Sequence, residues 1–243
     1  MRKLLAIWLG KILTIVGKTV GKKSSSSPGA YALKICPDLV KGLEKCVSKG
    51  IIVTCGTNGK TTTNNLMALA LEAKGYKVIC NKLGANMLSG IATTVLQEMS
   101  IFGKLKADYA CLEIDEAYTP IVFDYVKPDV MVITNLFRDQ LDRYGEIDIT
   151  SDIIKRAIKK VPNLKLVLNG DDPLCVQFGR EENVKAYYYG ISEKVLPQLD
   201  DTKEGRFCPV CGEEQKYNYY HYSQLGDFYC PSCGFKRPEI DFE

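Results

Sequence analysis

The chain has 243 residues, of which 46% are hydrophobic and 25% charged, and these values exclude wholesale disorder. Its length suits one large domain with small attachments. The net charge of +3 is unevenly placed, because residues 1–23 carry six basic residues and no acid, which leaves −3 on the rest. The main body therefore lacks the basic excess of a nucleic-acid-binding protein, so nucleic acid is not an expected partner.

The N-terminal residues 1–23, MRKLLAIWLGKILTIVGKTVGKK, are predicted to form a basic amphipathic helix. Lysines interrupt its apolar middle, and no run reaches the roughly 18–20 apolar residues that span a bilayer. Its lysines Lys3, Lys11, Lys18 and Lys22 share one sector, opposite an apolar face of Leu5, Trp8, Leu9, Ile12, Leu13, Val16 and Val20. The helix either lies on an anionic membrane surface or packs its apolar face on the domain with its lysines outward. KKSSSSPG, residues 22–29, is typical of a flexible linker, and residues 1–28 form the first predicted unit.

From residue 50 onward, short apolar runs alternate with helical patterns. Strands are predicted over residues 50–55, 76–80, 107–114, 128–135 and 163–169, and helices over 60–75, 90–99 and 150–161. Strands that alternate with helices indicate a mainly parallel sheet covered on both faces. The expected fold class is therefore α/β.

A glycine-rich turn follows the first of these strands, in VTCGTNGKTTTN, residues 53–64. Between a strand and a helix such a turn binds phosphate, because its backbone N–H groups surround the anion. Lys60 is expected to reach the β- and γ-phosphates, and the Thr61 hydroxyl to bind Mg²⁺. Thr54 stands where the usual pattern has glycine, so the generic motif is met in part. The predicted ATP-binding residues of this turn are Gly56, Thr57, Asn58, Gly59, Lys60, Thr61 and Thr62.

Three later stretches, LEIDE, TNLFRDQLDRYGE and LNGDDP, follow predicted strands in order. Together with GTNGKTTT they resemble the Mur ligase family, ATP-dependent enzymes that join amino acids to cell-wall precursors. The second stretch matches that family through Asn135, Asp139, Asp142 and Gly145. The resemblance implies a Mur-ligase-type ATP-binding domain, which we place at residues 29–204.

The same resemblance implies roles for single residues. Lys60 and Glu113 would be catalytic, and Mg²⁺ would bind Thr61, Glu113 and Gln140, the last in place of the family's histidine. Asn169 would contact adenine and Asp172 the ribose. If the family resemblance is set aside, the position of Glu113 at a strand end is also compatible with an ordinary solvated carboxylate. The family's carbamylated lysine has no assigned counterpart, because Lys155 and Lys159 are offset from its expected position.

Two C-x2-C pairs, eighteen residues apart, lie near the C-terminus. This spacing predicts a structural Zn²⁺ site in a ribbon over residues 205–236, with Cys208, Cys211, Cys230 and Cys233 as ligands. Because Cys55, Cys80 and Cys111 lie in or beside apolar runs, we expect a reducing cytoplasm and six free thiols. The tyrosine-rich segment between the pairs has no clustered arginine and lysine, which favours a stabilising or protein-binding insert over an RNA reader.

The ribbon and the short basic helix resemble one branch of the family. Its members are synthetase subunits that use ATP to amidate the D-glutamate α-carboxylate of lipid II through an acyl phosphate. A GatD-type glutaminase is the implied partner and ammonia source, because the single histidine, His221, lies between the cysteine pairs and suits no cysteine nucleophile. We therefore expect a cytoplasmic protein, peripheral at the inner face of the membrane.

The sequence is also compatible with two other functions. One is a Mur- or folylpolyglutamate-type ligase that adds an amino acid instead of ammonia. The other is a nucleotide-dependent module that binds RNA or protein through its ribbon. The sequence ends ten residues after Cys233, so we also expect the family's C-terminal domain to be absent and the chain to be inactive alone.

Overall fold

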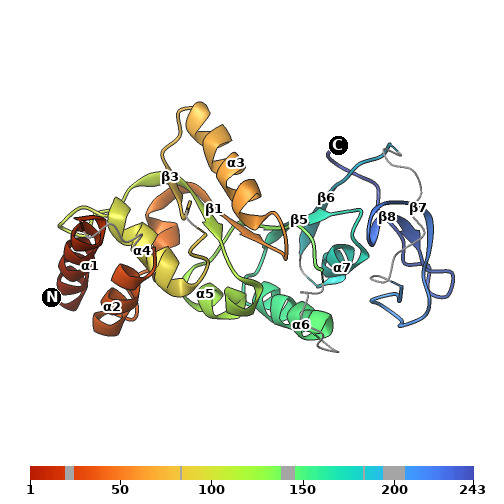
Figure 1. Ribbon diagram of the computed structural model, residues 1–243, viewed down its shortest axis with the longest axis horizontal. Helices are drawn as coiled ribbons and strands as arrows, with labels where there is room; N and C mark the ends of the chain where they lie inside the picture. The colour runs from red at the N-terminus through yellow and green to blue at the C-terminus, as the bar shows by residue number, and fades with distance from the viewer. Residues whose placement is uncertain (20–24, 83, 138–145, 183, 194–205) are drawn as a thin grey trace.

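A six-stranded parallel sheet forms the centre of the molecule, in the order β2-β3-β1-β4-β5-β6 (Figure 1). The computed structural model describes residues 1–19, 25–82, 84–137, 146–182, 184–193 and 206–243. The strands are β1 (Val47–Cys55), β2 (Val78–Cys80), β3 (Ala107–Glu113), β4 (Val130–Ile133), β5 (Lys165–Asn169) and β6 (Lys185–Tyr189). The predicted parallel α/β fold is confirmed. Strand β6 was not predicted, since its sequence KAYYY has no aliphatic run.

Helices cover both faces of this sheet. Figure 1 shows α3 on one side and α4, α5 and α6 on the other. The helices are α3 (Lys60–Ala73), α4 (Leu88–Glu98), α5 (Thr119–Tyr125), α6 (Glu146–Lys159) and α7 (Pro173–Val176), with 3-10 turns η1 (Leu43–Lys45), η2 (Glu116–Tyr118) and η3 (Gln177–Arg180). The helix predicted over 150–161 thus begins four residues earlier. The buried core lies between these layers and includes Ile51, Leu112 and Met131.

The register of the central strands brings three loops together. β1 lies between β3 and β4, with Thr54 opposite Glu113 and Cys55 opposite Ile133. Because all three strands run in parallel, their carboxyl ends meet at one edge of the sheet. In open α/β sheets, ligands bind outside these ends. A ligand-binding site is therefore expected at the loops after β1, β3 and β4.

The N-terminal helices α1 (Arg2–Thr19) and α2 (Ser27–Ile35) pack beside α4. The buried side of α1 holds Ala6, Ile7, Gly10 and Thr14, whereas Trp8 and most of the apolar face lie exposed. The predicted alternative in which the apolar face of this helix packs on the domain is therefore wrong. Gly10 allows the close approach of this buried side to α4, because a Cβ on Gly10 would lie 2.6 Å from a Leu96 methyl carbon.

The linker predicted over residues 22–29 is shorter than expected. Ser27 already begins α2, and Pro28 occupies its first turn, where the fixed φ of proline favours a helix start. Gly29 packs directly against α4, so residues 27–29 belong to the folded body. Among the helices that the structure describes, none combines the length and apolar character needed to cross a membrane.

The four-cysteine ribbon follows the sheet along the chain. Its strands β7 (Lys216–Tyr222) and β8 (Leu225–Tyr229) are antiparallel. Its small core consists of Val176, Cys208, Phe228, Cys230 and Phe235. An ion pair of 2.8 Å joins Arg237 to the buried Asp171 after β5, and Gln224 Nε2 donates to Leu136 O at 2.9 Å after β4. The ribbon is therefore anchored at the strand ends that carry the candidate site.

Candidate nucleotide site and metal centre

The loop after β1 requires glycine at two positions. Gly56 has φ +124°, and a Cβ there would lie 2.8 Å from Asn135 O. Gly59 has φ +81° and precedes the first residue of α3. Only glycine adopts such backbone angles without strain. The loop consequently turns sharply into the N-terminus of a 14-residue helix, where free backbone N–H groups can bind an anion.

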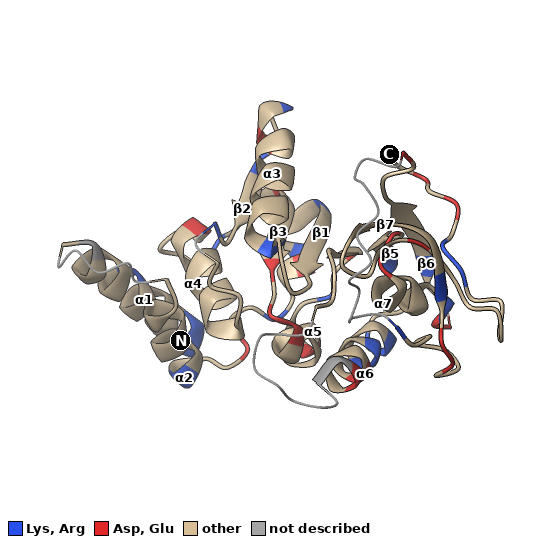
Figure 2. Ribbon diagram, turned by 45° about the vertical axis from the view of Figure 1, so that its right-hand side comes forward, with Lys and Arg blue, Asp and Glu red and all other residues tan. Residues whose placement is uncertain are grey.

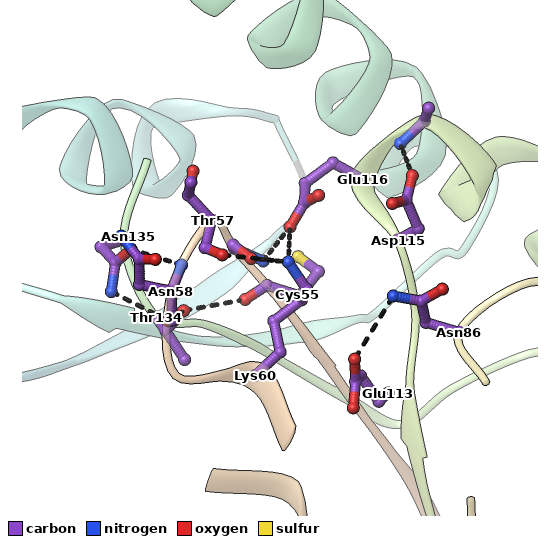
Figure 3. Close-up of polar contacts among 12 residues, drawn as sticks. Cys55, Thr57, Asn58, Lys60, Asn86, Glu113, Asp115, Glu116, Thr134 and Asn135 are labelled. Carbon is purple, nitrogen blue, oxygen red and sulfur yellow. Dashed lines mark hydrogen bonds and ion pairs between the residues drawn. The ribbon is translucent and has the colours of Figure 1, made fainter. Parts of the chain in front are cut away.

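Residues after β4 hold this loop in shape. Asn135 Oδ1 accepts from Asn58 N at 2.9 Å, and its Nδ2 donates to Asn58 O at 3.1 Å. Thr57 N donates to Asn135 O at 2.8 Å, and Thr134 Oγ1 donates to Asn58 O at 2.7 Å. Asn135 was singled out by its motif, whereas Thr134 was not predicted. The loop is thus preorganised by a neighbouring strand end (Figure 3).

Lys60, the first residue of α3, points back along the loop. Its Nζ donates to Gly56 O at 2.5 Å, to Thr57 O at 3.2 Å and to Glu116 Oε1 at 3.3 Å. The Lys60 side chain is only 15% exposed. The predicted phosphate-binding lysine therefore lies at the loop, with a carboxylate partner that sequence reasoning missed. The one available signal was that Glu116 closes the LEIDE stretch.

Glu113, at the end of β3, is 2% exposed, so the solvated-carboxylate interpretation is wrong. Asn86 Nδ2 donates to its Oε1 at 3.3 Å, and Asn81 Oδ1 accepts from its backbone N at 2.8 Å. Within the part of the chain that the structure describes, Glu113 Oε2 has no hydrogen-bond partner. A buried carboxylate oxygen without a partner is costly unless something binds it.

Thr61 and Glu113 converge beside Gly84. From the position that a Cβ on Gly84 would take, Thr61 Oγ1 lies at 3.5 Å and Glu113 Oε2 at 3.8 Å. A hydroxyl and a carboxylate oxygen are suitable ligands for a hard cation such as Mg²⁺. The residues present therefore fit the predicted cation. Gln140, the third predicted ligand, lies outside the described residues, as do Asp139, Asp142 and Gly145.

The two residues predicted to contact the nucleoside are buried in the framework. Asn169 Nδ2 donates to Thr134 O at 3.0 Å. Asp172 caps α7 by accepting from Leu174 N at 3.0 Å, and it also accepts from Leu136 N at 2.9 Å. Burial raises the pKa of Asp172 to about 6. Both side chains therefore join the ends of β4 and β5, and their roles toward a nucleotide stay predictions.

The four ribbon cysteines come together as expected for a metal centre. Their sulfur atoms all lie within 4.8 Å of one another, with Cys208–Cys233 and Cys211–Cys230 at 3.6 Å. A tetrahedron of about 2.3 Å Zn–S bonds has edges of about 3.8 Å, so the cluster fits such an ion. A backbone N–H of Cys233 lowers the pKa of the Cys230 thiol to about 7, whereas burial raises the pKa of the Cys208 thiol to about 12. None of the ten cysteines forms a disulfide bond.

The parallel sheet, the glycine loop with its lysine, and the adjacent carboxylate define a nucleotide-binding α/β protein of the phosphate-loop type. Residues 53–229 match the model of the Mur ligase middle domain, and the chain belongs to the Mur ligase family. The resemblance predicted from the motifs is thereby confirmed.

Within this family, the chain is most informatively compared with individual relatives. The chain is 38% identical over all 243 residues, 54% of the relative, to "Lipid II isoglutaminyl synthase (glutamine-hydrolyzing) subunit MurT" of Staphylococcus aureus strain COL. It is 39% identical over 220 residues, or 90% of this chain and 48% of the relative, to the protein of that name from Streptococcus pneumoniae. The chain thus spans about half the length of the curated relatives it matches.

Solved structures agree with the fold. A pseudomurein peptide ligase type C from Methanothermus fervidus is 30% identical, with a TM-score of 0.62 over 81% of this chain and 39% of that one. A MurF ligase from Thermotoga maritima in complex with ADP is 20% identical, with a TM-score of 0.54 over 67% of this chain and 37% of that one. The second likeness supports the fold alone.

Proposed function

We propose that this chain belongs to the synthetase subunit of a lipid II isoglutaminyl synthase. In this reaction ATP phosphorylates the D-glutamate α-carboxylate of lipid II, and ADP leaves. Ammonia attacks the resulting acyl phosphate and phosphate leaves, which gives D-isoglutamine. The observation that carries the proposal is the 38% identity to MurT over the whole chain, the same chain that contains the phosphate loop and Glu113.

The residues of the site have separate tasks in this proposal. Lys60 and the loop N–H groups hold the phosphates and offset the charge that spreads over the transferring phosphoryl oxygens. Thr61 and Glu113 are the described residues that would hold Mg²⁺, which supplies further charge neutralisation. A GatD-type glutaminase subunit supplies ammonia. A cysteine nucleophile needs a histidine base beside it, and His221, the only histidine of this chain, is buried in the ribbon with its Nε2 2.9 Å from Ile191 O. The ribbon cysteines hold one structural Zn²⁺.

An amidation assay tests the function. The gene product is combined with a GatD-type glutaminase, lipid II, ATP, Mg²⁺ and glutamine, and the muropeptides are analysed by mass spectrometry. We expect conversion of D-glutamate to D-isoglutamine that depends on ATP and on both proteins. Lipid II that stays unmodified when both proteins are folded and nucleotide is bound would contradict the proposal.

An amino-acid ligase is the second candidate. The likeness to the pseudomurein peptide ligase, at 30% identity, favours it. The same assay separates the two, because a ligase would add the mass of an amino acid and would need no glutaminase.

We propose in addition that α1 contacts an anionic membrane surface. Its exposed apolar side chains form one surface with the loop after α4; they are Leu5, Trp8, Ile12, Ile15, Val16, Ile101 and Phe102. Trp8 Nε1 donates to Ile101 O at 2.9 Å, which joins the helix to that loop. On a helical wheel Arg2 and Lys11 lie at opposite edges of the apolar face, and residues 1–19 hold no acid (Figure 2). An apolar face with basic edges suits an anionic bilayer interface.

Vesicle binding tests this surface. Trp8 is the only tryptophan, so its fluorescence reports on the face directly. We expect a blue shift with vesicles that contain phosphatidylglycerol, and a weaker one with neutral phosphatidylcholine. Ile12→Asp should weaken binding at least about tenfold, because insertion of one large aliphatic side chain contributes about 1.5–3 kcal/mol. Ile149→Asp on α6 is the matched control, since the two residues are 57% and 61% exposed. Equal binding by both variants would refute the surface.

A further inference from the structure

The anion-binding loop already holds a carboxylate of its own chain. Glu116 Oε1 accepts from Gly56 N at 2.5 Å and from Lys60 Nζ at 3.3 Å. Figure 3 shows the Glu116 carboxylate aimed at Lys60 Nζ. Gly56 and Lys60 are the first glycine and the lysine of the loop, so Glu116 bonds to two of the donors that a phosphate oxygen would use.

The local structure explains why Glu116, and not its neighbour, reaches the loop. Glu116 is the first residue of the short turn η2, which begins three residues after the end of β3. The Asp115 carboxylate caps this turn by accepting from Ala117 N at 3.0 Å, and Figure 3 shows it turned away from Lys60. Glu113, three residues before Glu116 at the end of β3, faces Thr61 and Gly84. Each of the three acids of this segment therefore has a different partner.

The free-energy cost of burying the Glu116 carboxylate is offset by its contacts with the loop. Its side chain is 15% exposed, and burial raises its pKa while the nearby Lys60 opposes that rise. A carboxylate in such surroundings is stable when it is paired and hydrogen-bonded. Within the described residues, Lys60 and Gly56 N are the side-chain and loop donors that serve it. The carboxylate and the phosphate loop therefore stabilise each other.

Lys60 has no donor to spare in this arrangement. An ammonium group has three N–H donors, and Gly56 O, Thr57 O and Glu116 Oε1 accept from it. A phosphate oxygen must therefore replace one of these acceptors. The two carbonyls belong to the loop backbone, whereas the Glu116 side chain can rotate away. A carboxylate that stayed in place would also repel the phosphate.

We propose that Glu116 occupies the anion position of the phosphate loop in the nucleotide-free protein, yields it when nucleotide binds, and so sets nucleotide affinity. This inference rests on the proposed nucleotide-binding function. It makes Glu116 an affinity-determining residue that acts by competing with the ligand for Lys60 and the Gly56 N–H. Its removal should therefore strengthen nucleotide binding, the opposite of what loss of a ligand contact does.

Titration with ADP tests the inference. Calorimetry is performed in EDTA, so that the loop and Lys60 bind the phosphates without a metal ion. We expect Glu116→Gln to bind ADP about tenfold more tightly than the wild type, because the competing charge is gone while size and shape remain. Asp115→Asn is the matched control, since it removes the same charge one residue away, and its affinity should stay within about twofold.

The possible results are distinct. Equal or weaker ADP binding by a folded Glu116→Gln variant, beside a wild type that binds, overturns the role of Glu116. A similar gain in Asp115→Asn would also overturn it, because a general charge effect would then explain the result. If Glu116→Gln does not fold, Glu116→Ala is used with the same expectation. If the folded wild type and every variant fail to bind ADP, the proposed function fails instead.

Discussion

Replacement of Lys60 by methionine is expected to lower ADP affinity at least 100-fold. Methionine keeps the unbranched apolar stem and the helix propensity at the start of α3, so the change removes the ammonium group alone. A charge-assisted bond to phosphate contributes about 1.5–3 kcal/mol, and Glu116 would remain beside the loop as an unopposed negative charge. Calorimetric titration with ADP, with and without Mg²⁺, measures the loss.

Lys82→Met is the control for this prediction. Lys82 also pairs with a glutamate, at 3.0 Å from Glu72, but its side chain is 50% exposed and lies away from the loop. Its replacement should leave the ADP affinity within about twofold. A Lys60→Met variant that is folded and binds ADP as tightly as Lys82→Met would show that the loop does not bind phosphate.

The second large effect is expected at the metal centre. The purified protein should hold one zinc ion per chain, and Cys233→Ser should abolish it and lower the free energy of unfolding by at least about 3 kcal/mol. Cys233 is exposed, so its replacement in a metal-free ribbon should cost less than about 0.5 kcal/mol. A large loss therefore reports on the metal ion itself. Metal analysis and denaturant unfolding measure the two quantities.

Cys46→Ser provides the comparison, because Cys46 is a partly buried free thiol outside the ribbon. This variant should keep the metal ion. Protein that contains no metal when prepared under reducing conditions with zinc present, and that unfolds alike with and without Cys233, would contradict the assignment. The effect should extend beyond the ribbon, since Arg237 and Gln224 connect it to the ends of β5 and β4.

Much of the site was predictable because its signals are local in the sequence. Gly56, Gly59 and Lys60 lie within five residues of one another, directly after an apolar strand. Positions whose backbone angles favour glycine can be recognised in the sequence, because glycine occupies them. Glu113 was predictable for a related reason, since the strand before it is apolar and strand ends meet at one edge of a parallel sheet.

The contacts of Glu116 and Thr134 could not be read from the same patterns. Each lies in a loop more than fifty residues from its partner, at positions where an acid or a threonine is common. Asp172 had a motif, but its burial and its bonds to Leu136 and Leu174 depend on how β4, β5 and α7 pack. Hydrogen bonds between distant segments follow from the sheet order, which the local sequence does not specify.

The sequence by itself determined five of the six strands and the helices α3, α4 and α6, together with the phosphate loop and the four-cysteine cluster, because periodicity, glycine positions and cysteine spacing act over short distances. Tertiary structure alone decided which side of α1 is buried. The hydrophobic pattern favoured the face that contains Trp8, but Gly10 allows close approach to Leu96 of α4, and the side with Ala6, Ile7 and Gly10 packs inward. Tertiary structure also placed Glu116 in the phosphate loop, since burial of that carboxylate is stable only where Lys60 and Gly56 N already meet it.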